Sequence, residues 1–213
     1  MVDNYIEVFG AVTGIVYVFL EIRQTIWLWP LGIITSGIYV WIFFSGKLYA
    51  DMSLQAYYMV VSVLGWYWWM RGSGRQAQGS ELRAQSSELN AQSSKQKLAV
   101  TRIKLKIAVI LAAIFVVLYT VMYIVLSRLT DSPVPAWDSF LTSLSVIATW
   151  MLARKIYEHW YLWIVVNIVS AVLYFTRGLF PTVVLYTVYL IMSFTGLIAW
   201  KRTIAETILP DDR

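Results

Sequence analysis

The stretch IAVILAAIFVVLYTVMYIVL, residues 107–126, decides the fold class, because it holds twenty consecutive residues without a charge. A helix that crosses a bilayer needs about 20 mostly apolar residues. The whole chain agrees: 59% of its 213 residues are hydrophobic and 14% are charged, against about 45–50% and 25% in soluble proteins, and its mean hydropathy is +0.65. This composition excludes a soluble domain and a disordered chain, and the absence of cysteine excludes a disulfide scaffold. The sequence predicts an integral membrane protein.

Six further stretches are apolar enough to cross a membrane, which gives seven expected spans. Helices are expected because lipid offers backbone groups no hydrogen-bond partners, and no train of alternating barrel strands is present. The amino terminus carries Asp3 and Glu7 but no Lys or Arg, unlike a signal peptide, so the first span is expected to be retained. The expected spans are residues 6–20, 26–44, 53–70, 107–126, 139–153, 160–175 and 182–200.

The distribution of basic residues predicts the orientation of these spans, because cytoplasmic loops are enriched in Lys and Arg. With the amino terminus outside, 14 of the 17 Lys and Arg residues fall inside, and only Lys47, Arg128 and Arg177 fall outside. We therefore expect the amino terminus outside and the carboxyl terminus inside. Topology then explains the net charge of +5, so nucleic acid is not an expected partner.

The polar stretch between the third and fourth spans divides the chain into expected units. Residues 1–72 form a first three-helix bundle, 73–106 a polar cytoplasmic linker, 107–130 a linking transmembrane helix, and 131–213 a second three-helix bundle with the carboxyl-terminal tail. The linker contains two copies of a heptapeptide, SELRAQS at 80–86 and SELNAQS at 87–93. Each copy has one Leu and no second apolar core position, which favours a linker over a coiled coil.

The two expected bundles resemble each other in sequence. Parallel alignment places Trp29 on Trp163 and Ser36 on Ser170, and small gaps bring further positions together. Two three-helix units share one orientation only when an odd number of spans separates them, and the isolated fourth span meets that condition. Parallel repeats of this kind occur in transporters such as the SWEETs. We therefore expect an all-α, SWEET-like 3+1+3 arrangement with a substrate path between the bundles. The further pairs are Gly46 with Gly178, Tyr58 with Tyr189, Gly65 with Gly196 and Trp69 with Trp200.

Residues that catalysis or ion coupling would need are missing from the expected spans. The chain has no phosphate-binding loop motif, one histidine and no cysteine, which argues against ATP hydrolysis, a metal site and a Cys–His nucleophile. Ion-coupled carriers and intramembrane enzymes need ionisable groups at depth. The acids nearest the spans lie close to their ends: Glu21, Asp51, Asp138 and Glu158. The sequence therefore favours an uncoupled carrier without catalytic residues, metal or cofactor, and His159 is interpreted as a loop residue.

Trp160, Trp163 and Asn167 share one face of the expected sixth span, because they are three and four residues apart. An unsatisfied amide in hydrocarbon is costly, so Asn167 must face protein, water or substrate. An interhelical hydrogen bond would satisfy it as well as a substrate would, and Trp160 lies close enough to the cytoplasmic surface to be an interfacial anchor. The combined face suits a planar, hydrogen-bonding ligand, above all a cationic one held by cation–π attraction.

Polar and aromatic side chains on other spans are weaker candidates. Gln55, Tyr58 and Ser62 form a stripe on the third span, although Gln55 lies close to the outer surface and could be solvated there. Tyr186 and Tyr189 occupy matching positions on the seventh span and could equally be interfacial tyrosines. The tryptophans near span ends are interpreted as interfacial anchors: Trp27, Trp66, Trp68, Trp137 and Trp200.

Three of these regions resemble the PnuC family of vitamin transporters. Residues 29–69 contain W-P-x-G, L-Y-A-D, Q-x-Y-Y and G-W-Y-x-W motifs similar to those of the family. The pattern E-x-W-x-x-W-x-x-x-N at 158–167 resembles the family's W-x-x-W region, and L-Y-x-x-Y at 185–189 resembles its last span, with Tyr189 where Phe is more usual. The resemblance covers both expected bundles and omits the polar linker.

The resemblance implies a multi-pass carrier in the bacterial inner membrane for unphosphorylated vitamin precursors, most often nicotinamide riboside. It implies facilitated diffusion, made effectively one-way by a cytoplasmic kinase that phosphorylates the substrate, and a homotrimer of SWEET-like seven-helix subunits. Carried over by position, the residues of the nicotinamide end would be Trp160, Trp163 and Asn167, and the ribose contacts would be Gln55, Tyr58 and Tyr186.

Two alternatives stay open at this point. The first is a thiamine or riboflavin carrier on the same scaffold, since thiamine also has a cationic ring and riboflavin would need a roomier pocket. The second is a membrane receptor or assembly subunit that moves no substrate.

Overall fold

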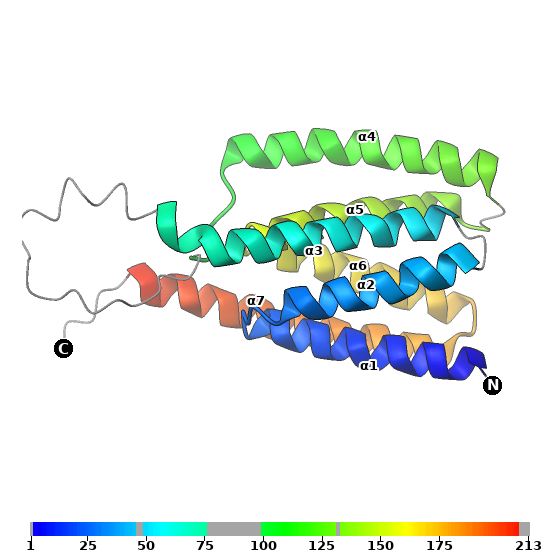
Figure 1. The fold of residues 1–213 in the computed structure, drawn as a ribbon. Helices are drawn as coiled ribbons and strands as arrows, with labels where there is room; N and C mark the ends of the chain where they lie inside the picture. Colours follow the sequence, from blue (N-terminus) through cyan, green and yellow to red (C-terminus); the bar gives the residue numbers. More distant parts are fainter. Residues whose placement is uncertain (1, 46–48, 76–98, 131–132, 209–213) are drawn as a thin grey trace, which may run out of the picture.

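The computed structural model describes residues 2–45, 49–75, 99–130 and 133–208, and this part of the chain is almost entirely helical (Figure 1). It contains seven α-helices, which confirms the expected all-α class. Each expected span coincides with one helix over most of its length. The helices are α1 (Val2–Ile22), α2 (Leu28–Ser45), α3 (Tyr49–Arg75), α4 (Leu105–Leu129), α5 (Pro135–Ala153), α6 (His159–Thr176) and α7 (Phe180–Ile208).

Four of these helices, α2, α4, α6 and α7, are long enough and apolar enough to cross a bilayer by themselves. Helix α1 has a shorter apolar part, Gly10–Ile22. Three of the polar residues of α5, Ser139, Ser143 and Thr149, are buried and do not lie on an outer face. Large apolar side chains are exposed instead along α4, among them Val109 and Val117, as expected for a surface that faces lipid. The protein is therefore a multi-pass membrane protein.

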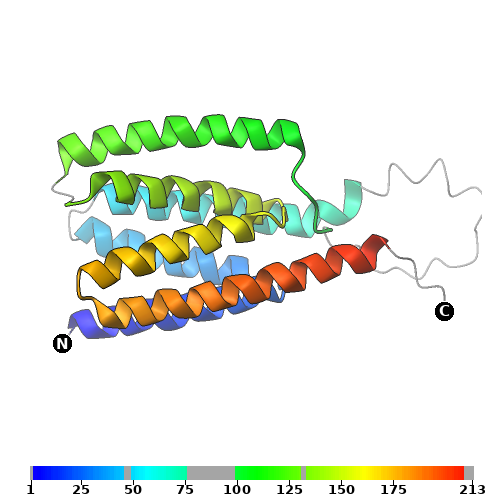
Figure 2. The same cartoon turned by 180° about the vertical axis from the view of Figure 1, so that it is seen from behind.

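The helices run side by side, and α4 lies at the edge of the bundle beside α5 (Figures 1 and 2). Among the described helices, α4 packs only against α5. The other six form a closed ring, because each packs against two neighbours in the order α1, α2, α3, α5, α6, α7 and back to α1. The most extensive contacts within this ring join α2 to α3 and α6 to α7.

A tryptophan ring lies on a glycine in each of these two helix pairs. Trp29 of α2 covers Gly65 of α3, and Trp160 of α6 covers Gly196 of α7, so closely that a Cβ atom at either glycine would overlap the ring. Both rings are almost fully buried. Glycine permits this approach because it has no side chain, and small residues commonly allow close packing of membrane helices.

A second tryptophan meets each ring at right angles in the same helix pair. The ring centroids of Trp29 and Trp69 are 5.3 Å apart with an interplanar angle of 87°, and those of Trp160 and Trp200 are 5.9 Å apart at 82°. Edge-to-face pairs of this kind contribute about 0.5–1.5 kcal/mol beyond the area they bury. These two tryptophan–glycine–tryptophan clusters form the tightest part of the core.

Helices α2 and α6 have the same length, and the turns that precede them match. Helix α6 begins 131 residues after α2 (His159 against Leu28) and also ends 131 residues after it (Thr176 against Ser45). The turns that precede α2 and α6 each contain a residue with φ of +51°, Gln24 and Lys155, which differ by the same 131 residues.

The segment before α4 is attached to the turn between α5 and α6. The backbone N–H of Thr101 donates to the Lys155 carbonyl at 2.9 Å, and the N–H of Tyr157 donates to the Thr101 carbonyl at 3.1 Å. The N–H of Ile103 donates to Glu158 Oε2 at 3.0 Å. The two heptapeptides of the expected linker fall outside the described residues.

Two expectations from the sequence are wrong. Trp200 is not an interfacial anchor, since it is fully buried and its Nε1 donates to the Glu21 carbonyl at 3.1 Å. His159 is not a loop residue, since it begins α6 and is also fully buried. Both side chains contact Glu21, which lies far away in sequence, so neither position could be judged from its neighbours. By contrast, Trp27 and Trp137 are exposed, at 69% and 51%.

The tryptophan–glycine contacts predict a pattern of stability. Gly65→Ala and Gly196→Ala should each lower the free energy of unfolding by about 1–3 kcal/mol, because the added methyl group overlaps a buried ring. Gly37→Ala is the matched control, since a Cβ at this α2 position meets nothing within 4 Å. Melting temperatures of the purified proteins in detergent measure the difference. Equal melting temperatures for Gly65→Ala and Gly37→Ala would contradict the prediction.

Candidate functional site

A cavity of about 380 Å³ lies at the centre of the six-helix ring. Its volume falls within the roughly 300–1,000 Å³ that is typical of small-molecule sites. All six helices of the ring contribute to its wall, and α4 contributes none of the described residues. The wall is formed by Gly10, Thr13, Gly14, Tyr17, Val18, Glu21, Gly32, Thr35, Ser36, Tyr39, Tyr58, Ser62, Ser145, Thr149, Leu152, Trp160, Trp163, Val166, Asn167, Tyr186, Tyr189 and Ser193.

Five of the six site residues predicted from the sequence meet at this cavity. They are Tyr58 from α3, Trp160, Trp163 and Asn167 from α6, and Tyr186 from α7. Gln55 is the exception: it lies on α3 three residues before Tyr58 and is not part of the wall. The sequence left open whether Tyr189 on the last span is a site residue or an interfacial tyrosine. In the structure it lines the cavity.

Within the described part of the chain, the indole N–H groups of the two tryptophans of α6 have no hydrogen-bond partner. Trp160 packs against both His159 and Trp200, with ring centroids 4.7 Å and 5.9 Å away. Nε1 of Trp160 and Nε1 of Trp163 are buried and have no hydrogen-bond partner among the described residues. A buried unsatisfied N–H costs about 1–3 kcal/mol. Both residues line the cavity, although the two nitrogen atoms themselves are buried.

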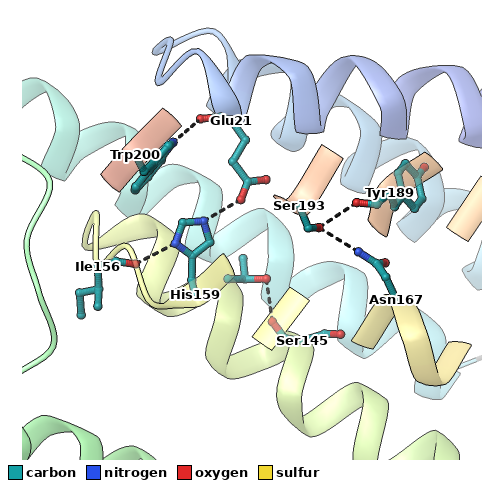
Figure 3. Close-up of polar contacts among 9 residues, drawn as sticks. Glu21, Ser145, Ile156, His159, Asn167, Tyr189, Ser193 and Trp200 are labelled. Atoms are coloured by element: carbon teal, nitrogen blue, oxygen red, sulfur yellow. Dashed lines mark hydrogen bonds and ion pairs between the residues drawn. The ribbon is translucent and has the colours of Figure 1, made fainter. Parts of the chain in front are cut away.

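Asn167 is held so that its carbonyl oxygen is available to a ligand (Figure 3). Ser193 Oγ donates its single hydrogen to the Tyr189 backbone carbonyl at 2.8 Å, so toward Asn167 it can only accept. Asn167 Nδ2 therefore donates to Ser193 Oγ, at 3.0 Å. The amide orientation follows from this chain of bonds. Oδ1 points away from Ser193 and can accept a hydrogen bond from a molecule in the cavity.

Tyrosines form the wall on the side nearer the amino terminus of α1. Tyr186 stacks on Tyr174 with ring centroids 5.3 Å apart and meets Tyr189 edge-on at 5.9 Å. The hydroxyl groups of Tyr189 and Tyr39 lie directly on Gly14 and Gly10 of α1, where any side chain would overlap them. The two glycines thus make room for hydroxyl groups from α7 and α2.

The opposite end of the cavity holds a buried ion pair that sequence reasoning missed. Glu21 Oε1 of α1 lies 2.9 Å from His159 Nε2 of α6, and the other ring nitrogen, Nδ1, lies 2.7 Å from the Ile156 carbonyl (Figure 3). Glu21 is 2% exposed. The sequence placed Glu21 near the end of a span, as the structure does, but it did not predict that this end of the helix meets the cavity.

No group of His, Cys, Asp and Glu side chains in the described part of the chain is arranged to hold a metal ion. The cavity instead combines flat aromatic surfaces, hydroxyl groups, an amide acceptor and one carboxylate. This combination suits binding of a planar, polar molecule of modest size, with acceptors, donors and a positive charge to match the wall.

The sequence has clear relatives. The family model described as "Nicotinamide mononucleotide transporter" matches residues 4–202. The chain is 26% identical over 209 residues to the nicotinamide riboside transporter PnuC of Escherichia coli K12, which covers 95% of this chain and 87% of that protein. It is 28% identical over 211 residues to PnuC of Neisseria mucosa (95% and 74%), and 26% identical over 194 residues to the riboflavin/roseoflavin transporter RibM of Streptomyces davaonensis (91% and 83%).

A solved structure shares the fold. The crystal structure of the vitamin B3 transporter PnuC superposes with a TM-score of 0.64 at 24% sequence identity, over 92% of this chain and 80% of that one. The resemblance to PnuC transporters seen in the motifs is thereby confirmed. Because the family match runs from residue 4 to residue 202 and reaches all six helices around the cavity, the chain belongs to the nicotinamide mononucleotide transporter family.

Proposed function

We propose that this protein carries nicotinamide riboside across the membrane through the central cavity. The observation that carries the proposal is the face formed by Trp160, Trp163 and Asn167, which lines a nucleoside-sized cavity in a chain related to nicotinamide riboside transporters. Nicotinamide riboside is a planar pyridinium cation with a carboxamide and a ribose. Each of these parts has a counterpart in the wall.

The wall residues assign roles within the proposed site. The pyridinium ring packs against the indole surfaces of Trp160 and Trp163, where cation–π attraction contributes about 0.5–2 kcal/mol. The carboxamide N–H donates to Asn167 Oδ1, the acceptor that Ser193 leaves free. Tyr58 and Tyr186 contact the ribose hydroxyls. Gln55, which lies outside the wall, has no role in the site as proposed.

Transport proceeds by facilitated diffusion in this proposal, with a cytoplasmic kinase that traps the substrate as a phosphate. Among the described residues that line the cavity, Glu21 is the only one that is acidic or basic, and it is paired with His159. Ion-driven carriers usually place several ionisable groups along the substrate path, as in relays of Asp, Glu and His side chains. A single internally paired acid supports uncoupled carriage.

We also propose a 3+1+3 architecture, in which α1–α3 and α5–α7 are parallel repeats and α4 links them. The equal bounds of α2 and α6 support it, as do the matching turns at Gln24 and Lys155. The register of the proposed repeat differs from the sequence alignment in α2: the 131-residue shift pairs Trp29 with Trp160 and not with Trp163. The same shift pairs Gly65 with Gly196, and Trp29 covers Gly65 as Trp160 covers Gly196.

The proposed orientation places the amino terminus outside and the carboxyl terminus inside the bacterial inner membrane. The end of α3, the α5–α6 turn and the end of α7 lie at one end of the molecule (Figure 1). Basic residues gather at this end, where Arg154 lies over Trp68 at 4.7 Å and Lys155 over Trp69 at 4.2 Å. Such clustering is typical of a cytoplasmic face. Assembly as a homotrimer completes the proposal and follows from the family resemblance alone.

A riboflavin carrier is the second candidate, because RibM is among the relatives. Riboflavin is larger than nicotinamide riboside and uncharged, so it would make no use of the Glu21 carboxylate in the wall. The cavity therefore favours nicotinamide riboside, and direct competition between the two vitamins decides the matter.

The first prediction from the proposed function concerns flux. Trp163→Ala should reduce uptake of labelled nicotinamide riboside into proteoliposomes by about tenfold, because the ring cation loses an aromatic surface. Trp27→Ala is the matched control, since Trp27 is exposed and outside the wall, and its flux should stay at the wild-type level. Unchanged flux in Trp163→Ala would remove this residue from the site. Stronger inhibition by unlabelled riboflavin than by unlabelled nicotinamide riboside would favour the second candidate.

The second prediction concerns energy coupling. With the membrane potential clamped, imposed proton or sodium gradients should leave nicotinamide riboside flux and its final internal concentration unchanged. The clamp is needed because the potential alone moves a cationic substrate. Accumulation above the external concentration, driven by either gradient under the clamp, would refute facilitated diffusion.

The third prediction concerns recognition of the carboxamide. Asn167→Leu should weaken nicotinamide riboside binding about tenfold in calorimetry, because the substrate N–H loses its acceptor. Ser193→Ala should weaken binding less, since Oδ1 remains present. Nicotinic acid riboside, which has a carboxylate in place of the carboxamide, should bind the wild-type protein weakly and be insensitive to Asn167→Leu. A similar loss for both ligands would show that Asn167 does not read the carboxamide.

A further inference from the structure

The Glu21 carboxylate faces the cavity from the end of α1, and the proposed contacts to the aromatic ring, carboxamide and ribose do not use it. It is the sole acidic or basic side chain among the described wall residues. Its buried position, 2% exposed, makes an unbalanced charge costly there. Another group must therefore compensate the negative charge of the Glu21 carboxylate.

The hydrogen bonds of His159 show how the charge is balanced. Nδ1 lies 2.7 Å from the Ile156 carbonyl, which can only accept, so Nδ1 carries a hydrogen. Nε2 lies 2.9 Å from Glu21 Oε1, and a hydrogen must lie between these two atoms because their lone pairs would otherwise repel. The pair is then either imidazolium with carboxylate or imidazole with carboxylic acid. Both forms have zero net charge.

The neutral pair is nevertheless a directed dipole. His159 lies behind Oε1, whereas the second oxygen, Oε2, points to the side on which Ser193 and Asn167 lie (Figure 3). The contact with His159 uses Oε1, so Oε2 lies on the side of the carboxylate away from His159. A cation in the cavity meets the negative end of this dipole first and stabilises the imidazolium–carboxylate form.

We propose that Glu21 makes the cavity select cationic over neutral molecules of the same shape, with His159 as the positioning residue that holds the carboxylate in place. The inference rests on the proposed function, since it assigns charge selectivity to the same cavity. It differs from cation–π attraction by Trp160 and Trp163, which acts on the face of the aromatic ring and not through a formal charge.

A purely structural role is the competing explanation. The pair joins α1 to α6, and the Glu21 carbonyl also accepts from Trp200 Nε1 of α7, so the contact could simply fasten three helices. A fastening role affects all ligands alike, because it changes the amount or the stability of the folded protein. Charge selection changes the ratio between two ligands on the same protein.

The experiment compares binding of nicotinamide riboside with binding of its 1,4-dihydro form, which has nearly the same shape and no charge. Calorimetry on the purified protein in detergent avoids any contribution from membrane potential. Wild-type protein should prefer the cation, and Glu21→Gln should lower the ratio of the two affinities about tenfold. Gln keeps the side-chain length and can donate to His159 Nε2. Asp138→Asn removes a carboxylate outside the wall and should leave the ratio unchanged.

His159→Gln provides an independent arm if Glu21→Gln folds poorly. It removes the partner but keeps the carboxylate, so the preference for the cation should be retained or increased. A structural role predicts parallel losses for both ligands in both variants, and that result would overturn the proposal. An unchanged ratio in Glu21→Gln would also overturn it. If the wild-type protein binds neither ligand, the proposed function fails and charge selection fails with it.

Discussion

Two tryptophan rings seated on two glycines hold the molecule in its shape. Trp29 on Gly65 brings α2 against α3, and Trp160 on Gly196 brings α6 against α7, each closer than any larger residue would permit. In a bilayer there is little hydrophobic force between helices, so packing of this kind carries much of their association. Once the two pairs are fixed, α1 and α5 can close the ring only by bridging them. The cavity is the space that remains at the centre of that ring.

The contact between Trp160 and Gly196 also makes the site rigid. Trp160 belongs both to the cluster with Gly196 and Trp200 and to the cavity wall, so the surface offered to a ligand is part of the core. Its ring cannot turn away without separating α6 from α7. A ligand therefore meets an aromatic surface that is already in place, which limits the conformational entropy lost on binding. The polar part of the wall is fixed in the same way, since Ser193 and the Tyr189 carbonyl hold the amide of Asn167.

Local patterns in the sequence predicted the structural features that depend only on neighbouring residues. Hydropathy placed the helices, and the spacing of Trp160, Trp163 and Asn167 placed them on one face that proves to line the cavity. The same reasoning included Gln55 because it shares a stripe with Tyr58 and Ser62, yet the structure puts only Tyr58 and Ser62 of this stripe in the wall.

Contacts between distant parts of the chain lay beyond such reasoning. Glu21 looked like an acid at a helix end and His159 like a loop residue, because their contact joins positions 138 residues apart. Neither residue has a local pattern that points to the other. Trp200 was misjudged for the same reason, since the carbonyl that fixes its indole belongs to Glu21.

Under the proposed 131-residue register, corresponding positions in the two halves of the ring carry side chains of different size and chemistry. The shift places Gly32 of α2 opposite Trp163 of α6, and Ser36 opposite Asn167, and all four line the cavity. The first half thus contributes small residues that leave space, and the second contributes the ring and the amide that fill part of it. A symmetric pair of tryptophans at these positions would occupy much of the cavity, and a symmetric pair of glycines would offer a ligand no surface. An asymmetric ligand, with a flat ring at one end and hydroxyl groups at the other, fits a cavity wall whose two halves differ in this way.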